Sequence, residues 1–263
     1  MLRIAIAGAS GRMGRAICEQ APEHAARVTG ALVRSGSERV GEAVSGVEGL
    51  RYSDDPDTAF QDAEVVLDFS TPGAASTIAE HCVAQGRALL VGTTGLDDST
   101  RATLQAAGRQ IPVLLAPNTS PGVNLLAALV EKVAGMLGED YDIEITEAHH
   151  RHKVDAPSGT ALRLGEAAAA GRGIDHSERA VHARQGQIGP REAGDIGYSV
   201  IRGGDIPGEH SVLFAGPGER IELGHRASSR ATFAVGALRA AAWLAGKPAG
   251  FYTMDDMLGL DRL

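Results

Sequence analysis

The sequence contains little cysteine and no long apolar run. Its 263 residues include two cysteines, Cys18 and Cys82, which form no CxxC or paired pattern. Neither a disulfide framework nor a zinc site is therefore predicted. The longest uncharged stretch, residues 110–130, is interrupted by proline, asparagine and glycine. It is a poor candidate for a transmembrane helix.

Positive charge is also in short supply. Lys and Arg number 25 against 33 Asp and Glu, which gives a formal net charge of -8. Such a balance argues against a nucleic-acid surface that covers a whole domain. The N-terminus enters an apolar segment directly, with no basic region or cleavage site, so no signal peptide is predicted. We expect a cytoplasmic protein of one or two domains without a nucleic-acid or membrane partner.

The first half of the chain alternates between short apolar runs and helical patterns. Strands are predicted at 2–8, 27–33, 63–70, 88–95 and 111–117, and helices at 12–24, 71–86 and 99–109. Strands that alternate with helices form parallel crossovers, with helices on both faces of the sheet. The first half is therefore predicted to be a Rossmann-like, doubly wound α/β domain that binds a nucleotide.

The pattern changes after Pro117. A helix is predicted at 121–137, a strand at 141–150 and a helix at 160–170. Strand-like runs follow at 180–184, 196–202, 210–215 and 220–225, and a last helix is predicted at 228–245. Consecutive strands joined by short turns indicate an antiparallel or mixed sheet, so a second domain of α+β type is expected.

A glycine-rich segment, "GASGRMG", lies between the first strand and the first helix. Its glycines are Gly8, Gly11 and Gly14, a spacing that differs from G-x-G-x-x-G. Three glycines can still provide a tight turn, a close approach to pyrophosphate and close helix packing. An ordinary glycine-rich turn is the alternative. The strand–loop–helix context favours dinucleotide binding.

The second strand ends without the carboxylate that an NAD site usually has there. The sequence reads "ALVRSGS", so Val33 and Arg34 occupy the strand end. Arg34, helped by Arg12, could hold the 2′-phosphate of NADP through charge-assisted hydrogen bonds. A solvated arginine at the end of a strand is the alternative.

The stretch "EAHHRHKVDAPSGTA", residues 147–161, concentrates cationic and titratable groups. Ser158 is a good N-cap, and the N–H groups of Gly159 and Thr160 would then point out of the first helical turn. A helix start of this kind binds carboxylate or phosphate. Together with Lys153 and the three histidines, it suits a small substrate with more than one negative charge and a reaction that needs a proton.

A metal site and a solvated charged loop are the two alternatives for this stretch. The possible metal ligands are Glu147, His149, His150 and His152. Adjacent residues on a strand point to opposite faces, and the neighbouring lysine and arginine would repel a cation, so no metal is expected. A solvated loop does not account for three histidines within four positions.

These motifs, with "VGTTG" and "ASSRATFAVGA", resemble the 4-hydroxy-tetrahydrodipicolinate reductases (dihydrodipicolinate reductases) of bacterial lysine biosynthesis. The resemblance runs from Ile4 to the C-terminus. It implies a dinucleotide-binding domain at 1–118, completed by 229–263, and a substrate-binding and oligomerisation domain at 119–228. It also implies that NADPH or NADH reduces a cyclic dicarboxylate with loss of water, in a homotetramer. A dinucleotide-binding regulator and a metal-dependent hydrolase are the rival functions.

The resemblance also implies roles for individual residues. His149 would be the acid/base group, Lys153 the proton donor, and His150, Gly159 and Thr160 substrate contacts. The implied cofactor contacts are Gly8, Ala9, Ser10, Gly11, Arg12, Met13, Gly92, Thr93, Thr94, Ala116, Pro117, Asn118 and Thr119. Arg34 matches an arginine that some members use on NADP, whereas Val33 stands where better-studied members carry an acidic residue.

Overall fold

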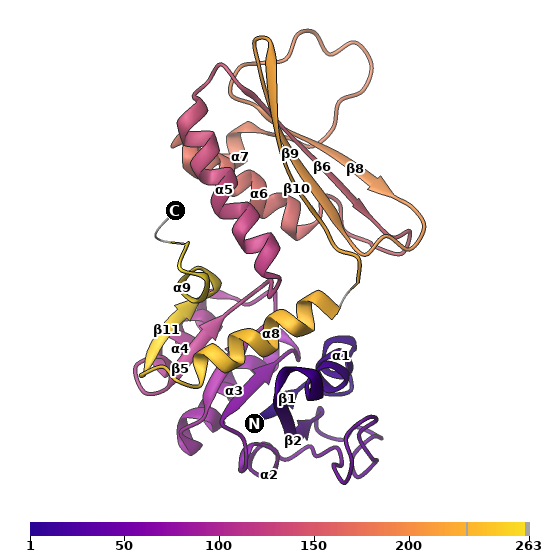
Figure 1. The fold of residues 1–263 in the computed structure, drawn as a ribbon, viewed down its shortest axis with the longest axis vertical. Helices are drawn as coiled ribbons and strands as arrows, with labels where there is room; N and C mark the ends of the chain where they lie inside the picture. Colours follow the sequence, from indigo (N-terminus) through magenta and orange to yellow (C-terminus); the bar gives the residue numbers. More distant parts are fainter. Residues whose placement is uncertain (230, 261–263) are drawn as a thin grey trace. The chain divides into compact units, whose positions relative to one another are not determined.

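The computed structural model describes residues 1–229 and 231–260, and the chain forms two compact units (Figure 1). Met1–Pro121 and 231–258 form the first, and the second is built around Gly122–Ser229. Arg230 and 261–263, which the sequence prediction assigns to the returning segment, lie outside the described residues. Within the described ranges, no helix is long and apolar enough to cross a membrane.

The first unit contains a six-stranded parallel sheet in the order β11-β5-β4-β3-β1-β2. The strands are β1 Leu2–Ala7, β2 Ala26–Leu32, β3 Val65–Asp68, β4 Ala88–Val91, β5 Pro112–Leu115 and β11 Gly250–Thr253. Every residue of β3 and β4 is buried, as is typical of parallel strands that helices cover on both faces. The predicted doubly wound α/β fold is confirmed.

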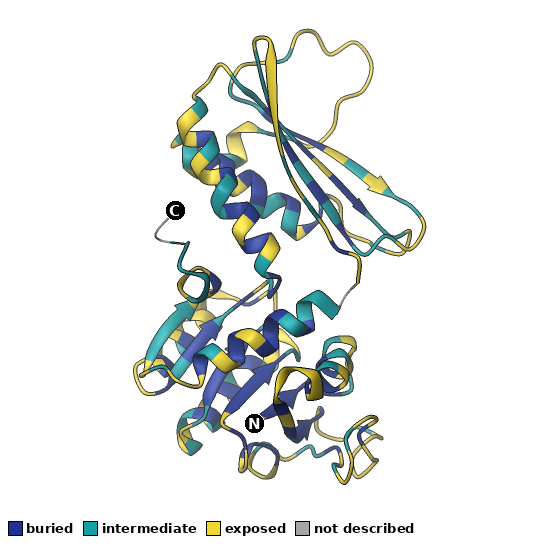
Figure 2. Cartoon of the chain, viewed as in Figure 1, coloured by how far each residue is buried: buried dark blue, intermediate teal, exposed yellow. Residues whose placement is uncertain are grey.

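Helices cover both faces of this sheet. Helices α1 (Arg12–Gln20) and α8 (Ala231–Leu244) share one apolar core with it. The opposite core contains α2 (Pro56–Phe60), α3 (Pro72–Gln85) and α4 (Asp98–Ala107). Figure 2 shows the strands between them as a mostly buried layer.

Several elements differ from the sequence prediction in their bounds. Strand β3 ends at Asp68, whose carboxylate accepts hydrogen bonds from the Ser70 N–H at 2.9 Å and from the Ser70 hydroxyl, so the chain turns there. Helix α1 ends at Gln20, before a 3₁₀ turn over Pro22–His24, because proline supplies no N–H to continue the helix. The prediction did not include β11, α2 or α9 (Met254–Leu258). These elements are four or five residues long, too short to establish a periodic pattern.

The second unit contains a five-stranded mixed sheet in the order β10-β9-β6-β8-β7. The strands are β6 Asp142–His149, β7 Ala180–Val181, β8 Ile196–Arg202, β9 Glu209–Gly216 and β10 Glu219–Arg226. The β6–β8 and β7–β8 pairs are parallel, and the β6–β9 and β9–β10 pairs are antiparallel. The mixed sheet confirms the predicted α+β type.

Helices α5 (Pro121–Leu137) and α6 (Gly159–Arg172) form the core of this unit together with the sheet, and the short helix α7 (His176–Arg179) follows α6. Alternate residues of β6 and β9, such as Ile143, Ile145, Val212 and Phe214, are buried in that core. Period-two burial of this kind fixes the register, because a one-residue slip would turn these side chains to the other face.

Candidate active site

The glycine-rich loop joins β1 to α1 in a conformation that its glycines make possible. Gly8 has φ of 77°, and a Cβ there would lie 2.4 Å from the Phe69 carbonyl oxygen. A Cβ at Gly14 would lie 2.5 Å from the Ala9 carbonyl oxygen, so α1 packs closely against the loop. Gly11 is the N-cap of α1 and provides no side chain to its first turn. That turn can therefore present its N–H groups to an anionic ligand.

A cavity of about 670 Å³ opens beside this loop. Its volume lies within the range of small-molecule and cofactor sites. Among the predicted cofactor residues it gathers Gly8, Ser10, Gly11 and Arg34. Apolar side chains, including Val33 and Ile78, and two arginines, Arg34 and Arg39, line it as well. The apolar wall next to the glycine loop suits the adenosine half of a dinucleotide. The two exposed guanidinium groups suit a 2′-phosphate on its ribose.

The other predicted cofactor residues lie near the same edge of the sheet without lining this cavity. Arg12 and Met13 begin α1, and the side chain of Ala9 is fully buried. Gly92, Thr93 and Thr94 directly follow β4, and Ala116, Pro117, Asn118 and Thr119 follow β5. Because β1, β4 and β5 are parallel strands of one sheet, their carboxyl ends meet at one edge, where open α/β sheets bind ligands.

Two threonines of these segments have structural hydrogen bonds. The Thr93 hydroxyl oxygen accepts from the Ser70 N–H at 3.1 Å, and the Thr119 hydroxyl donates to the Phe233 carbonyl at 2.7 Å. Both side chains are buried. Any contact that these two residues make with a cofactor would therefore come mainly from their backbone atoms.

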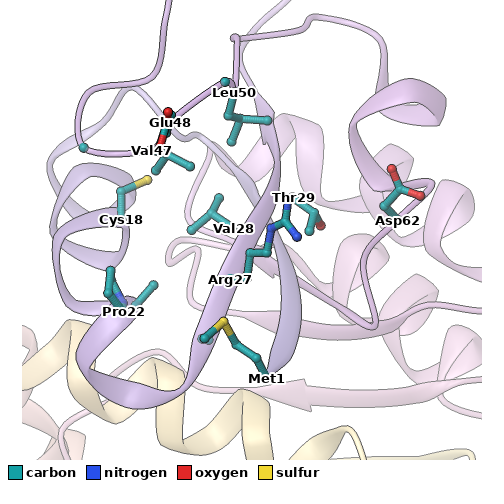
Figure 3. Close-up of a pocket in the computed structure, with 14 residues that line it drawn as sticks. Met1, Cys18, Pro22, Arg27, Val28, Thr29, Val47, Glu48, Leu50 and Asp62 are labelled. Carbon is teal, nitrogen blue, oxygen red and sulfur yellow. The ribbon is translucent and has the colours of Figure 1, made fainter.

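A separate cavity of about 690 Å³ lies beside β2 and the loop 46–50 (Figure 3). Its lining mixes Arg27, Glu48 and Asp62 with apolar side chains and includes no predicted site residue. Cys18, which also lines it, is 2% exposed, and burial raises the pKa of its thiol to about 11. A thiol with so high a pKa is a poor nucleophile, so this cavity offers no reactive cysteine.

The second candidate region is the end of β6 and the loop that follows it. Glu147 is 1% exposed, and its carboxylate receives a bidentate pair of hydrogen bonds from Arg202, both at 2.7 Å. It also contacts His149 Nδ1 at 2.6 Å and accepts from the Ser158 N–H at 3.0 Å. Burial raises the pKa of Glu147, but the hydrogen bonds from Arg202, His149 and Ser158 outweigh it, so the pKa is lowered and the group is ionised.

Helix α6 begins directly beside this carboxylate. Ser158 is its N-cap, as the sequence indicates, and the Ser158 hydroxyl accepts from the Ala161 N–H at 3.2 Å. The same hydroxyl contacts His210 Nε2 at 3.0 Å. Burial, with a further contribution from His149, lowers the pKa of His210 to about 4, so this histidine is neutral near pH 7. Gly159 and Thr160 form the first turn of α6.

Backbone hydrogen bonds hold the cationic loop against residues 203–206. The His150 N–H donates to the Ile206 carbonyl at 2.8 Å, and the Gly203 N–H donates to the His149 carbonyl at 3.0 Å. Lys153 Nζ is paired with the Asp155 carboxylate at 2.8 Å, and this hydrogen bond lowers the pKa of Asp155. The fold thus gathers the predicted substrate residues at the end of β6, in this loop and at the start of α6.

Arg202 and His210 were missed in the sequence analysis. They lie on β8 and β9, which flank β6 in the sheet. Their only signal in the sequence is a polar residue near the end of one apolar strand and another near the start of the next. Among the described residues, no three His, Cys, Asp or Glu side chains are grouped as metal ligands would be.

Comparisons with known proteins agree with these observations. Residues 2–119 match the family model for the N-terminus of dihydrodipicolinate reductase, and residues 122–258 match that for its C-terminus. The 4-hydroxy-tetrahydrodipicolinate reductase of Nitrosospira multiformis is 50% identical over 266 residues, covering 98% of each chain. That of Alkalilimnicola ehrlichii is 51% identical over 264 residues, covering 98% of this chain and 99% of the relative.

A solved structure shares the fold at lower sequence identity. It is a dipicolinate-bound dihydrodipicolinate reductase from Paenisporosarcina sp. TG-14, with a TM-score of 0.73 and 21% identity over 96% of this chain and 97% of that chain. The two family models together match nearly the whole chain. The resemblance read from the motifs is confirmed: this chain belongs to the dihydrodipicolinate reductase family.

Proposed function

We propose that this chain reduces 4-hydroxy-tetrahydrodipicolinate to tetrahydrodipicolinate with NADPH or NADH, in the diaminopimelate route to lysine. In this reaction the substrate gains a hydride and a proton and loses water, while the cofactor is oxidised. The observation that carries the proposal is the group formed by His149, which Glu147 anchors, Lys153 and the start of α6. The relatives of this chain bear the proposed activity in their names.

The first unit is the proposed cofactor-binding domain. Its glycine loop and the N–H groups at the start of α1 suit a pyrophosphate, and Arg34 suits a 2′-phosphate. The segments after β4 and β5 lie at the edge of the sheet where the nicotinamide half would extend. A reduced nicotinamide supplies the hydride when it is bound.

The second unit is the proposed substrate-binding domain. The N–H groups of Gly159 and Thr160 at the start of α6, together with His150, suit a carboxylate of the substrate. In this proposal Lys153 Nζ gives a proton to the ring atom where electron density collects, and His149 assists as the acid/base group. Lys153 must then exchange Asp155 for the substrate. The Lys153 side chain is 20% exposed and that of Asp155 is 53% exposed, so solvent screens the pair from the Asp155 side and the exchange costs on the order of 1 kcal/mol.

Assembly and location belong to the proposal as well. In this proposal a homotetramer forms through the sheet of the second unit, and the face of that sheet opposite α5 and α6 supplies the contact surface. A groove on that face is lined by Ala148, Ile201 and Leu213, and Ile201 is 51% exposed. Light scattering coupled to size exclusion would test the tetramer, and a monomer at working concentration would contradict it. A cytoplasmic location fits a biosynthetic reductase of this type.

The proposed activity can be tested with purified protein and substrate generated in situ by dihydrodipicolinate synthase. We expect the nicotinamide absorbance to fall only when the synthase, both of its substrates and this protein are present. The loss should continue after treatment with a chelator. Binding of NADPH without turnover would favour the non-catalytic regulator, and activity that a chelator abolishes would favour a metal enzyme.

A further inference from the structure

Four hydrogen-bond donors converge on the two carboxylate oxygens of Glu147. Oε1 accepts from Arg202 Nη2 at 2.7 Å and from the Ser158 N–H at 3.0 Å. Oε2 accepts from Arg202 Nη1 at 2.7 Å and lies 2.6 Å from His149 Nδ1. We infer that Glu147 is a positioning residue that fixes the tautomer of His149 and the start of α6 through one buried carboxylate. The inference rests on the proposed role of His149.

The chemistry of the carboxylate decides which nitrogen of His149 bears the proton. An ionised carboxylate can only accept hydrogen bonds, so the Nδ1 atom beside it must be the donor. In the neutral imidazole, Nε2 is then the bare nitrogen. This is the reverse of the tautomer that free histidine favours in water. Nε2 is therefore the His149 atom that can exchange a proton with a ligand.

The surroundings of His149 support this assignment. His210, whose ring centroid is 5.1 Å from that of His149, lies edge-on to it and directs its Nε2 to the Ser158 hydroxyl. His210 therefore does not compete for the Glu147 carboxylate. Gly208 adjoins the other nitrogen of His149, because a Cβ at Gly208 would lie 3.1 Å from Nε2. The absence of a side chain at position 208 leaves room at Nε2.

The same carboxylate couples two parts of the proposed substrate site. Its Oε1 anchors the Ser158 N–H, and Ser158 is the N-cap that sets the first turn of α6. Its Oε2 anchors His149. A glutamine at this position would present one NH₂ group to the converging donors, and its one oxygen could not replace two acceptors. Loss of the carboxylate should therefore disturb the imidazole and the helix start together.

Strand β6 also provides a matched control. Glu144 precedes Glu147 on β6, and its carboxylate is paired with Arg184 at 2.7 and 2.9 Å and with Arg191 at 3.1 Å. It thus shares the strand, the charge and the arginine pairing of Glu147 but has no histidine partner among the described residues. Glu144→Gln removes a carboxylate of the same kind without touching His149.

The experiment is ¹⁵N NMR of histidine-labelled protein at a mildly alkaline pH, with the His149 signals assigned from their loss in His149→Gln. We expect a protonated Nδ1 and a bare Nε2 in the wild type and in Glu144→Gln. In Glu147→Gln the His149 ring should populate both tautomers, because a glutamine can either accept a hydrogen bond from Nδ1 or donate one to it. If the proposed function holds, kcat should also fall at least about 10–100-fold in Glu147→Gln, the range seen when a carboxylate that orients a metal-ligating histidine is lost. The Kd for NADPH should not change.

Three results would overturn the inference. The first is an Nε2-protonated His149 in the wild type, a result that stands even if the Glu147→Gln protein does not fold. The second is an unchanged tautomer in Glu147→Gln. The third is an equal loss of the Nδ1-protonated tautomer in Glu147→Gln and Glu144→Gln. Because the NMR signal requires no turnover, an inactive wild type with the expected tautomer would refute the proposed function and leave the role of Glu147 intact.

Discussion

Arg34→Ala should weaken NADPH binding selectively. Arg34 directly follows the buried Val33, its side chain is exposed, and it lines the cavity beside the glycine loop. A charge-assisted hydrogen bond contributes roughly 1.5–3 kcal/mol. Since tenfold in affinity corresponds to about 1.4 kcal/mol, removing this bond should weaken binding roughly 10–100-fold. Arg39 lines the same cavity and can retain part of the phosphate interaction, so we expect a value near the lower limit.

The assay is a fluorescence titration of NADPH and NADH against wild type, Arg34→Ala and a control variant, Arg101→Ala. Arg101 is an exposed residue of α4 outside the lining of this cavity, so its replacement makes the same change in net charge. We expect the Kd for NADPH to rise only in Arg34→Ala and the Kd for NADH to stay within about twofold of wild type in both variants. Equal weakening of both cofactors by Arg34→Ala would refute the assignment of the 2′-phosphate to this arginine.

Three further predictions follow from the geometry. Lys153→Ala should lower kcat about 10²–10⁴-fold, as loss of a positioned general acid does, while His152→Ala should have much less effect; a near-normal kcat with a raised KM would make Lys153 a carboxylate clamp. The pKa of His210 falls from 6.5 to about 4 on folding, so the unfolded chain binds a proton first as the pH drops. Stability should therefore decrease from about pH 6.5 to pH 4, by at most on the order of 3 kcal/mol from this group, and urea unfolding of His210→Gln should depend less on pH over that range. Gly14→Ala should lower the free energy of unfolding by about 1–3 kcal/mol and weaken cofactor binding, because the new Cβ would lie 2.5 Å from the Ala9 backbone. As a control, a Cβ at Gly73 on α3 meets nothing within 4 Å, so Gly73→Ala should leave thermal unfolding near that of the wild type.

The sequence predicts the fold well where the physical pattern is local. Apolar runs such as "AEVVLDFS" alternate along the first half of the chain with helical segments such as the one that begins at Pro72. That alternation alone implies a doubly wound sheet. Strand β11 escaped prediction because an edge strand of four half-buried or exposed residues has neither a continuous apolar run nor a regular alternation.

The candidate site was predictable only in part for a related reason. The Ser158 N-cap and the cationic loop are contiguous in the sequence, so their positions could be read directly. Arg202 and His210 reach the site only because β8 and β9 pair with β6, and this pairing has no local sequence signature. Glu147 is a possible metal ligand by residue type, but both of its carboxylate oxygens are occupied by hydrogen bonds from Arg202, Ser158 and His149.

The most direct test of the proposed reaction follows the transferred hydrogen. NADPH deuterated at C4 of the nicotinamide, prepared as each stereoisomer in turn, is incubated with the protein and freshly generated 4-hydroxy-tetrahydrodipicolinate, and the product is examined by mass spectrometry. The proposal predicts tetrahydrodipicolinate that is one mass unit heavier with one stereoisomer and of normal mass with the other. Oxidation of NADPH without deuterium in the product from either stereoisomer, or no oxidation at all, would contradict it.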